Sequence, residues 1–272
     1  MAEPSPPKQN RYKALIERIF FGTNFGAYAP GKTSLPFERT DLEKAAEELG
    51  VALPKNLGDV VYSLRYRTPM PERVLETQPA GKEWIIEGAG RSSYRFLLVG
   101  INRILPNPDL VTIDIPDATP EIIATYTLND EQALLAKVRY NRLIDIFLGV
   151  TTYSLQNHLR TTVRDVGQIE IDEVYVGVDR RGAHFVIPVQ AKGGSDQLSV
   201  VQAKQDIACC AEKFPNLICR SISAQFMDDE RIAIFELTVE NERVLVVEER
   251  HYRLVPGDSI SSEKLRAYGL RS

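Results

Sequence analysis

Residues that bind soft metals or form cross-links are scarce in this chain. Its 272 residues include three cysteines, three histidines and one tryptophan. Cys209, Cys210 and Cys219 lack the spacing of a zinc site or of a disulfide framework, and the histidines are scattered. We therefore expect no zinc centre, and we interpret the cysteines as reduced core residues of a cytoplasmic protein.

Long apolar runs are also missing. No stretch approaches the ~20 apolar residues of a membrane-spanning helix, and the first ten residues are polar and proline-rich, unlike a signal peptide. Hydrophobic residues still make up 43% of the chain, enough for one large domain or two ordinary ones. We expect no membrane partner.

The chain has no excess of positive charge, which is the usual mark of a nucleic-acid-binding protein. The net charge is −4. Residues 1–110 hold 15 basic and 13 acidic residues, which leaves 18 basic and 24 acidic residues for the rest. Any DNA binding must therefore rest on local patches of charge.

The stretch from Gln168 to Gly194 has the pattern of a β-hairpin, because two apolar, β-branched runs flank a short charged turn. Strand alternation places Glu170 and Asp172 on one face of the first strand, and Gln190 and Lys192 on one face of the second. In a suitable register, Asp172, Gln190 and Lys192 converge at one end of the sheet.

Such a group of side chains suits phosphodiester hydrolysis. Acidic and amide oxygens can hold Mg²⁺, which polarises a phosphate and lowers the pKa of a bound water. A lysine beside the metal offers a compact positive charge to the water or to the developing phosphorane. The alternative is an ordinary hairpin, in which residues 189–192 are the solvated end of a strand and Glu170, Asp172 and Glu173 are its wet face.

The segments Glu170-Ile171-Asp172 and Val189-Gln190-Ala191-Lys192 resemble the active-site signature of the PD-(D/E)XK nuclease superfamily. This group includes type II restriction enzymes, Holliday-junction resolvases and RecB-type nucleases. Its pattern is an acid on one strand and an acid-any-Lys triplet on the next, and 17 residues separate Asp172 from Gln190 here. Gln190 departs from the commonest Glu or Asp, so an oxygen ligand is kept but a charge is lost. The resemblance covers roughly residues 130–240.

The resemblance implies a restriction-endonuclease-like α/β (α+β) fold with a mixed sheet flanked by helices. It also implies a DNA endonuclease of restriction or defence type that depends on Mg²⁺, with Mn²⁺ as a substitute. The metal ligands would be Asp172, the side-chain oxygen of Gln190 and the carbonyl of Ala191. Lys192 would orient the attacking water, and Glu170 would complete the catalytic set. Because two sites are needed to cut both strands, a homodimer is expected.

Three further residues could assist this site. The accessory candidates are Glu131 on the helix before the hairpin, Glu173 on the first strand and Gln202 on the helix after the second strand. The helix before the hairpin is expected over residues 130–149 and the helix after it over residues 197–214. The apolar face of the latter is expected to be Leu198, Val201, Ile207, Ala208, Ala211 and Phe214.

The N-terminal third has the element order of a winged-helix domain. Helical patterns over residues 11–21, 40–50 and 56–65 precede a hairpin pattern over residues 83–99, with Thr40 as the expected cap of the second helix. Residues 56–67 would then be the recognition helix in the major groove, with the hairpin near phosphates. The expected DNA-binding residues are Lys55, Asn56, Ser63, Arg65, Arg67, Arg91 and Arg95. A structural or protein-binding domain of this kind is the alternative.

We expect three segments in all. Residues 1–105 form the winged-helix-like domain, residues 106–129 a proline-rich linker in which residues 109–115 could form one strand, and residues 130–272 the nuclease-like catalytic domain. Two other functions compete with that of a nuclease. One is a catalytically inactive DNA-binding protein on a nuclease-like fold, and the other is a protein-interaction scaffold that binds no nucleic acid.

Overall fold

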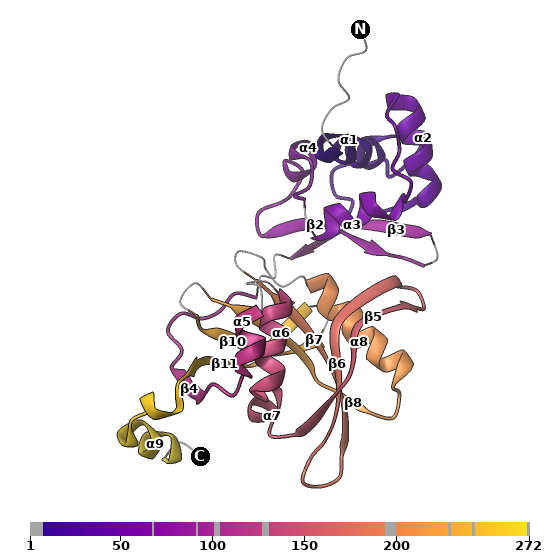
Figure 1. The fold of residues 1–272 in the computed structure, drawn as a ribbon. Helices are drawn as coiled ribbons and strands as arrows, with labels where there is room; N and C mark the ends of the chain where they lie inside the picture. The colour runs from indigo at the N-terminus through magenta and orange to yellow at the C-terminus, as the bar shows by residue number, and fades with distance from the viewer. Residues whose placement is uncertain are drawn as a thin grey trace. The chain divides into compact units, whose positions relative to one another are not determined.

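The computed structural model describes residues 8–66, 68–90, 92–100, 104–126, 131–193, 200–227, 230–240 and 243–270. The chain divides into two compact units, both mixed in helix and strand (Figure 1). The first comprises residues 1–101 and 162–168, and the second comprises residues 102–161 and 169–272. None of the described helices is both long enough and apolar enough to cross a membrane.

The first unit consists of helices packed on a three-stranded antiparallel sheet with the strand order β1-β3-β2. Its elements in chain order are α1 (Lys8–Phe21), β1 (Ser34–Glu38), α2 (Arg39–Leu49), α3 (Gly58–Tyr66), α4 (Glu72–Leu75), β2 (Lys82–Gly88) and β3 (Ser93–Gly100). Phe20 of α1 is fully buried, and its ring contacts Trp84 of β2 and Phe96 of β3 edge-on. These aromatic contacts attach α1 to the sheet.

Two local predictions for this unit were wrong. No strand was expected before α2, but β1 pairs with β3 there, with Leu35 opposite Phe96. Its five residues alternate between exposed and buried, a pattern too short to stand out from a loop. The helix α2 begins at Arg39 instead of after Thr40, because the carboxylate of Asp41 accepts a hydrogen bond of 2.8 Å from the backbone N–H of Glu38.

The second unit contains a large mixed sheet with helices on both faces, as expected. Its elements are β4 (Thr112–Pro116), α5 (Glu121–Tyr126), α6 (Glu131–Tyr140), α7 (Leu143–Leu148), β5 (Thr151–Val163), β6 (Gly167–Val178), β7 (His184–Lys192), α8 (Val200–Lys213), β8 (Ile218–Cys219), β9 (Ser221–Phe226), β10 (Ile232–Glu240), β11 (Arg243–Val255), a 3₁₀ turn (Gly257–Ser259) and α9 (Ser262–Gly269).

The strand order of this sheet is β4-β11-β10-β9-β7-β6-β5, with β8 also paired to β7. Pairs β6–β7, β9–β10 and β10–β11 are antiparallel, whereas β7–β9 and β4–β11 are parallel. The strand β4 lies where one strand was expected within the linker segment over residues 106–129. Thr112–Pro116 pairs with His251–Val255, so this proline-rich segment contributes a strand to the sheet.

Helices cover the two faces of the sheet separately. Residues of α6 and α7 pack with Ile232 and Ile234 of β10, whereas Ala203 of α8 packs with Ala233 and Phe235. Successive strand residues point to opposite faces, so α8 lies on the face opposite α6 and α7. Consistent with this, β7 is buried along nearly its whole length.

The single helix predicted over residues 130–149 is broken into α6 and α7. Arg142 between them has a positive φ of 51°, which ends the first helix although the apolar pattern continues.

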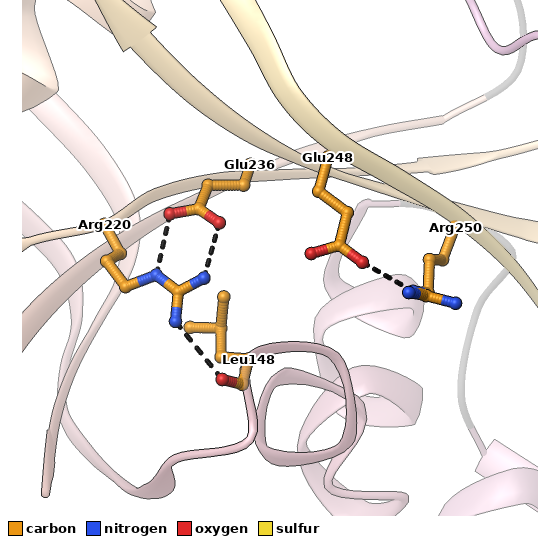
Figure 2. Close-up of polar contacts among 5 residues, drawn as sticks. All are labelled: Leu148, Arg220, Glu236, Glu248 and Arg250. Carbon is orange, nitrogen blue, oxygen red and sulfur yellow. Dashed lines mark hydrogen bonds and ion pairs between the residues drawn. The ribbon is translucent and has the colours of Figure 1, made fainter. Parts of the chain in front are cut away.

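Arg220, just before β9, connects α7 to the sheet through an ion pair and a hydrogen bond (Figure 2). Its guanidinium makes a two-pronged ion pair with Glu236 of β10, at 2.7 Å from Nε and 2.5 Å from Nη2. Its Nη1 donates at 3.2 Å to the carbonyl of Leu148, the last residue of α7. This contact satisfies a carbonyl at the helix end that has no partner within the helix. On the neighbouring strand, Glu248 and Arg250 form a separate, more exposed pair.

Candidate functional site

The hairpin β6–β7 brings the three central predicted residues together. The paired register runs to Glu173 opposite Val189, so Asp172 and Gln190 come next on the two strands. There the Oδ2 atom of Asp172 accepts a hydrogen bond of 2.9 Å from the backbone N–H of Ala191. The hairpin therefore gathers three polar groups at one end. They are the carboxylate of Asp172, the amide of Gln190 and, two residues further along β7, the ammonium group of Lys192.

Gln190 is almost completely buried, with 1% of its surface exposed. Its Nε2 atom donates to two acceptors at 3.2 Å each, the backbone carbonyl of Glu170 and the Oδ1 atom of Asp206. Its Oε1 atom is buried and makes no hydrogen bond within the described residues. Ser223 of β9 lies beside Gln190 in the register, and its hydroxyl also lacks a partner there. A buried amide oxygen without a donor is rare and points to a missing ligand or water.

Lys192 extends from the end of β7 toward α6. Its Nζ atom lies 3.4 Å from Oε1 of Glu131, the first residue of α6. The side chain of Lys192 is 13% exposed, whereas that of Glu131 is 40% exposed. Glu131 is thus the accessory residue that the structure brings to the site, through Lys192.

Glu170 contributes its backbone to the site and directs its side chain to β5. Its carboxylate accepts a hydrogen bond of 3.2 Å from Arg160, and Nδ1 of His158 lies 3.7 Å away. Glu170 and His158 are close enough to Asp172 to affect its ionisation in opposite directions. Both side chains therefore belong to the surroundings of Asp172.

Glu173, another accessory candidate, is placed elsewhere. Glu173 points to the opposite face from Asp172, where it is fully buried and accepts hydrogen bonds from Arg139 at 2.8 Å and Ser154 at 2.5 Å. Gln202 is half-buried on α8. Glu173 holds α6 and β5 to β6 and does not contact the Asp172 group.

The pKa of Asp172 is raised above its usual value. Burial is the main cause, and it outweighs the opposing effects of the Ala191 N–H and of the Lys192 charge. A carboxylate under such a desolvation penalty is stabilised by any cation that binds beside it.

Asp206 of α8 is a residue of this site that was not anticipated from sequence. It is 1% exposed and bonded to Gln190. The prediction that Ile207, Ala208 and Ala211 form the buried face of α8 was wrong, because the helix instead buries Val201, Ala203, Gln205, Asp206, Cys209 and Cys210. The helical spacing of Ala203, Asp206 and Cys210 carries the signal, which was missed because an acid was assumed to face water.

Replacing Asp206 by asparagine should raise stability at high pH. Burial, the first cause, and the charge of Asp172 hold the pKa of Asp206 well above the 3.8 of an ordinary aspartate. Below pH 3.8 the residue is protonated in both folded and unfolded chains, and its contribution to stability is fully present. As the pH rises through the folded-state pKa, that contribution is lost, because only the unfolded chain releases the proton without penalty.

Asparagine has nearly the same shape and cannot ionise. We expect Asp206→Asn to match the wild type in thermal melting near pH 4 and to melt at a higher temperature at about pH 8, without added metal. An equal melting temperature at the higher pH would show that the buried carboxyl carries no such penalty.

The donor atoms at this site suit a hard divalent cation. Among the described residues, no group of three or more His, Cys, Asp or Glu side chains is arranged to hold a metal. The set here is of another kind, namely one carboxylate of Asp172, the Oε1 amide oxygen of Gln190 and the carbonyl of Ala191. Oxygen ligands of these types are those that Mg²⁺ accepts, and the unpartnered Oε1 atom fits this use.

The expected DNA-binding residues of the first unit differ in their hydrogen-bond and ion-pair partners. Lys55 and Asn56 are exposed, although Oδ1 of Asn56 also accepts a hydrogen bond from Gly58 N–H at the start of α3. Ser63 is bonded to Thr68, and Arg95 is paired with Glu87. Arg67, Arg91 and the side chain of Arg65 lie outside the described part of the chain.

Comparison with known proteins gives no relative for this chain. No protein-family model matches it, and no match was found among curated proteins or among solved structures. The inference of function therefore rests on the residues of the site.

Proposed function

We propose that this protein is a Mg²⁺-dependent DNA endonuclease of restriction or defence type. The observation that carries the proposal is the end of the β6–β7 hairpin. There Asp172, Gln190 and Lys192 come together, and the amide oxygen of Gln190 is left without a partner among the described residues. The resemblance of these strands to the PD-(D/E)XK signature supports a restriction-endonuclease-like identity for the large mixed sheet.

Each residue would have a defined role in hydrolysis. Asp172, the Gln190 side chain and the Ala191 carbonyl would hold the Mg²⁺ ion, which supplies Lewis-acid polarisation of the phosphate. Lys192 would orient the attacking water through Nζ and stabilise the negative charge that develops on the phosphate oxygens. Water adds to phosphorus and a bridging P–O bond breaks, which yields a phosphomonoester and a hydroxyl. Glu131 would keep Lys192 in place.

The first unit would bind the DNA. Its order of helix, strand, three helices and two strands supports a winged-helix-like domain, with α3 as the recognition helix. Lys55 and Asn56, just before α3, and Arg95 of β3 are the exposed candidates for DNA contact among the described residues. Cleavage of both strands would use two copies of the chain.

Plasmid cleavage tests the proposal. Supercoiled, linear and methylated DNA are incubated with wild type and with Asp172→Asn at about 10 mM Mg²⁺, a concentration suited to a weakly held hard cation. We expect discrete bands or nicked circles with the wild type and none with the variant. Absence of cleavage by the wild type on every substrate, with Mn²⁺ tried as well, would refute it.

The amide at position 190 favours a second candidate, a DNA-binding protein on an inactive nuclease-like fold. An amide in place of a carboxylate lowers the charge available to a metal. Such a protein would bind DNA with a linear loss of log affinity against log salt, and Mn²⁺ would leave its melting temperature unchanged.

A further inference from the structure

Asp206 on α8 contacts Gln190, one of the proposed metal ligands. It lies on α8, on the face of the sheet that Gln190 also faces, and it is 1% exposed. Its Oδ1 atom accepts from Nε2 of Gln190 at 3.2 Å, while Oδ2 has no partner among the described residues. Nothing in the hydrolytic scheme above uses this buried acid.

Two hydrogen-bond acceptors determine the orientation of the Gln190 amide. The backbone carbonyl of Glu170 has no hydrogen to donate, and Oδ1 of Asp206 acts as an acceptor here. If the amide were turned over, Oε1 would meet the Glu170 carbonyl with no hydrogen between the two oxygens. The NH₂ group must therefore face Glu170 and Asp206, and Oε1 must face away from them.

We propose that Asp206 is a positioning residue that holds the Gln190 amide so that its oxygen, and not its nitrogen, is presented to a divalent cation. This inference rests on the proposed function. An amide has one end that binds a cation and one end that does not, whereas a carboxylate has an oxygen at both ends. A glutamine ligand therefore needs a neighbour that selects its orientation, and a glutamate ligand does not.

A double-mutant cycle separates this role from a general structural one. The four proteins are wild type, Asp206→Asn, Gln190→Glu and the variant that carries both substitutions. Mn²⁺ binding is measured by titration calorimetry at one pH without DNA, and folding is checked by circular dichroism. Glu212→Gln is the matched control, because it removes a negative charge from the same helix at an exposed ion pair with Lys213.

We expect the sign of the Asp206→Asn effect to reverse between the two backgrounds. In the wild-type background, the asparagine introduced at position 206 offers both a donor and an acceptor, so only the Glu170 carbonyl still selects the orientation of the Gln190 amide. The amide then spends part of its time turned over, and Mn²⁺ affinity falls about tenfold. In the Gln190→Glu background, the same change removes a repulsion between two acids and supplies a donor, so affinity rises. Glu212→Gln should leave affinity within about twofold of the wild type, as expected for an exposed pair.

Three other results would overturn the positioning role. Asp206→Asn could leave Mn²⁺ affinity unchanged, or it could weaken binding equally in both backgrounds. In both cases the wild type still binds metal and the nuclease proposal stands. A wild type that binds no Mn²⁺ and cuts no DNA would instead overturn both proposals together.

Discussion

Replacement of Lys192 by methionine is expected to reduce plasmid cleavage by about 10²–10³-fold, the usual loss when one preorganised group that stabilises charge in the transition state is removed. Methionine keeps the length and apolar stem of the side chain but has no charge. Because Lys192 is not among the expected metal ligands, Mn²⁺ should still raise the melting temperature of the variant.

The control for Lys192→Met is Lys213→Met. Lys213 is paired with Glu212 on the surface of α8, so its loss removes the same charge from a solvated position. Arginine at position 192 should restore little activity, because its planar, weakly hydrated guanidinium does not replace a compact ammonium group. Undiminished cleavage by Lys192→Met would show that this lysine takes no part in the reaction.

Replacement of Arg220 by methionine is expected to lower the free energy of unfolding by about 3 kcal/mol, at the lower end for removing one partner of a buried ion pair. The side chains of Arg220 and Glu236 are only 22% and 12% exposed, so the variant leaves the Glu236 carboxylate buried without its cation. The carbonyl at the end of α7 also loses its donor.

Arg250→Met is the matched control, since Arg250 pairs with Glu248 on the adjacent strand (Figure 2). Those side chains are 51% and 35% exposed, so we expect a loss below about 1 kcal/mol. Urea unfolding followed by circular dichroism measures both variants. Equal losses would contradict the view that burial sets the energy of the Arg220 pair.

Elements formed by segments close together in the chain could be predicted from sequence. The two runs of the β6–β7 hairpin are rich in β-branched apolar residues and flank a clear turn, so their pairing and the meeting of Asp172 with Gln190 and Lys192 could be predicted. Pairing with distant partners could not be predicted. A strand was expected over residues 109–115, but its parallel partner β11, about 140 residues away, was not, and β1 becomes a strand only through pairing with a segment about 60 residues away.

The residues of the site that lie on the β6–β7 hairpin could be predicted from sequence. The prediction missed a residue with unusual burial. Asp206 was overlooked because buried acids are rare, although the spacing of Ala203, Asp206 and Cys210 on α8 contained the information. Glu131 was one of three accessory candidates, and its contact with Lys192 is what brings it to the site.

The parallel pairing of β4 with β11 has a consequence during synthesis. Thr112 pairs with His251, so β4 leaves the ribosome 139 residues before its partner. At usual bacterial or eukaryotic elongation rates this interval is on the order of 10 s. The strands of the first sheet all lie between Ser34 and Gly100, so they can pair before β4 has been synthesised. We therefore expect the nascent chain to fold its first unit early and to carry β4 unpaired until β11 emerges, a period in which chaperones would have the most to protect.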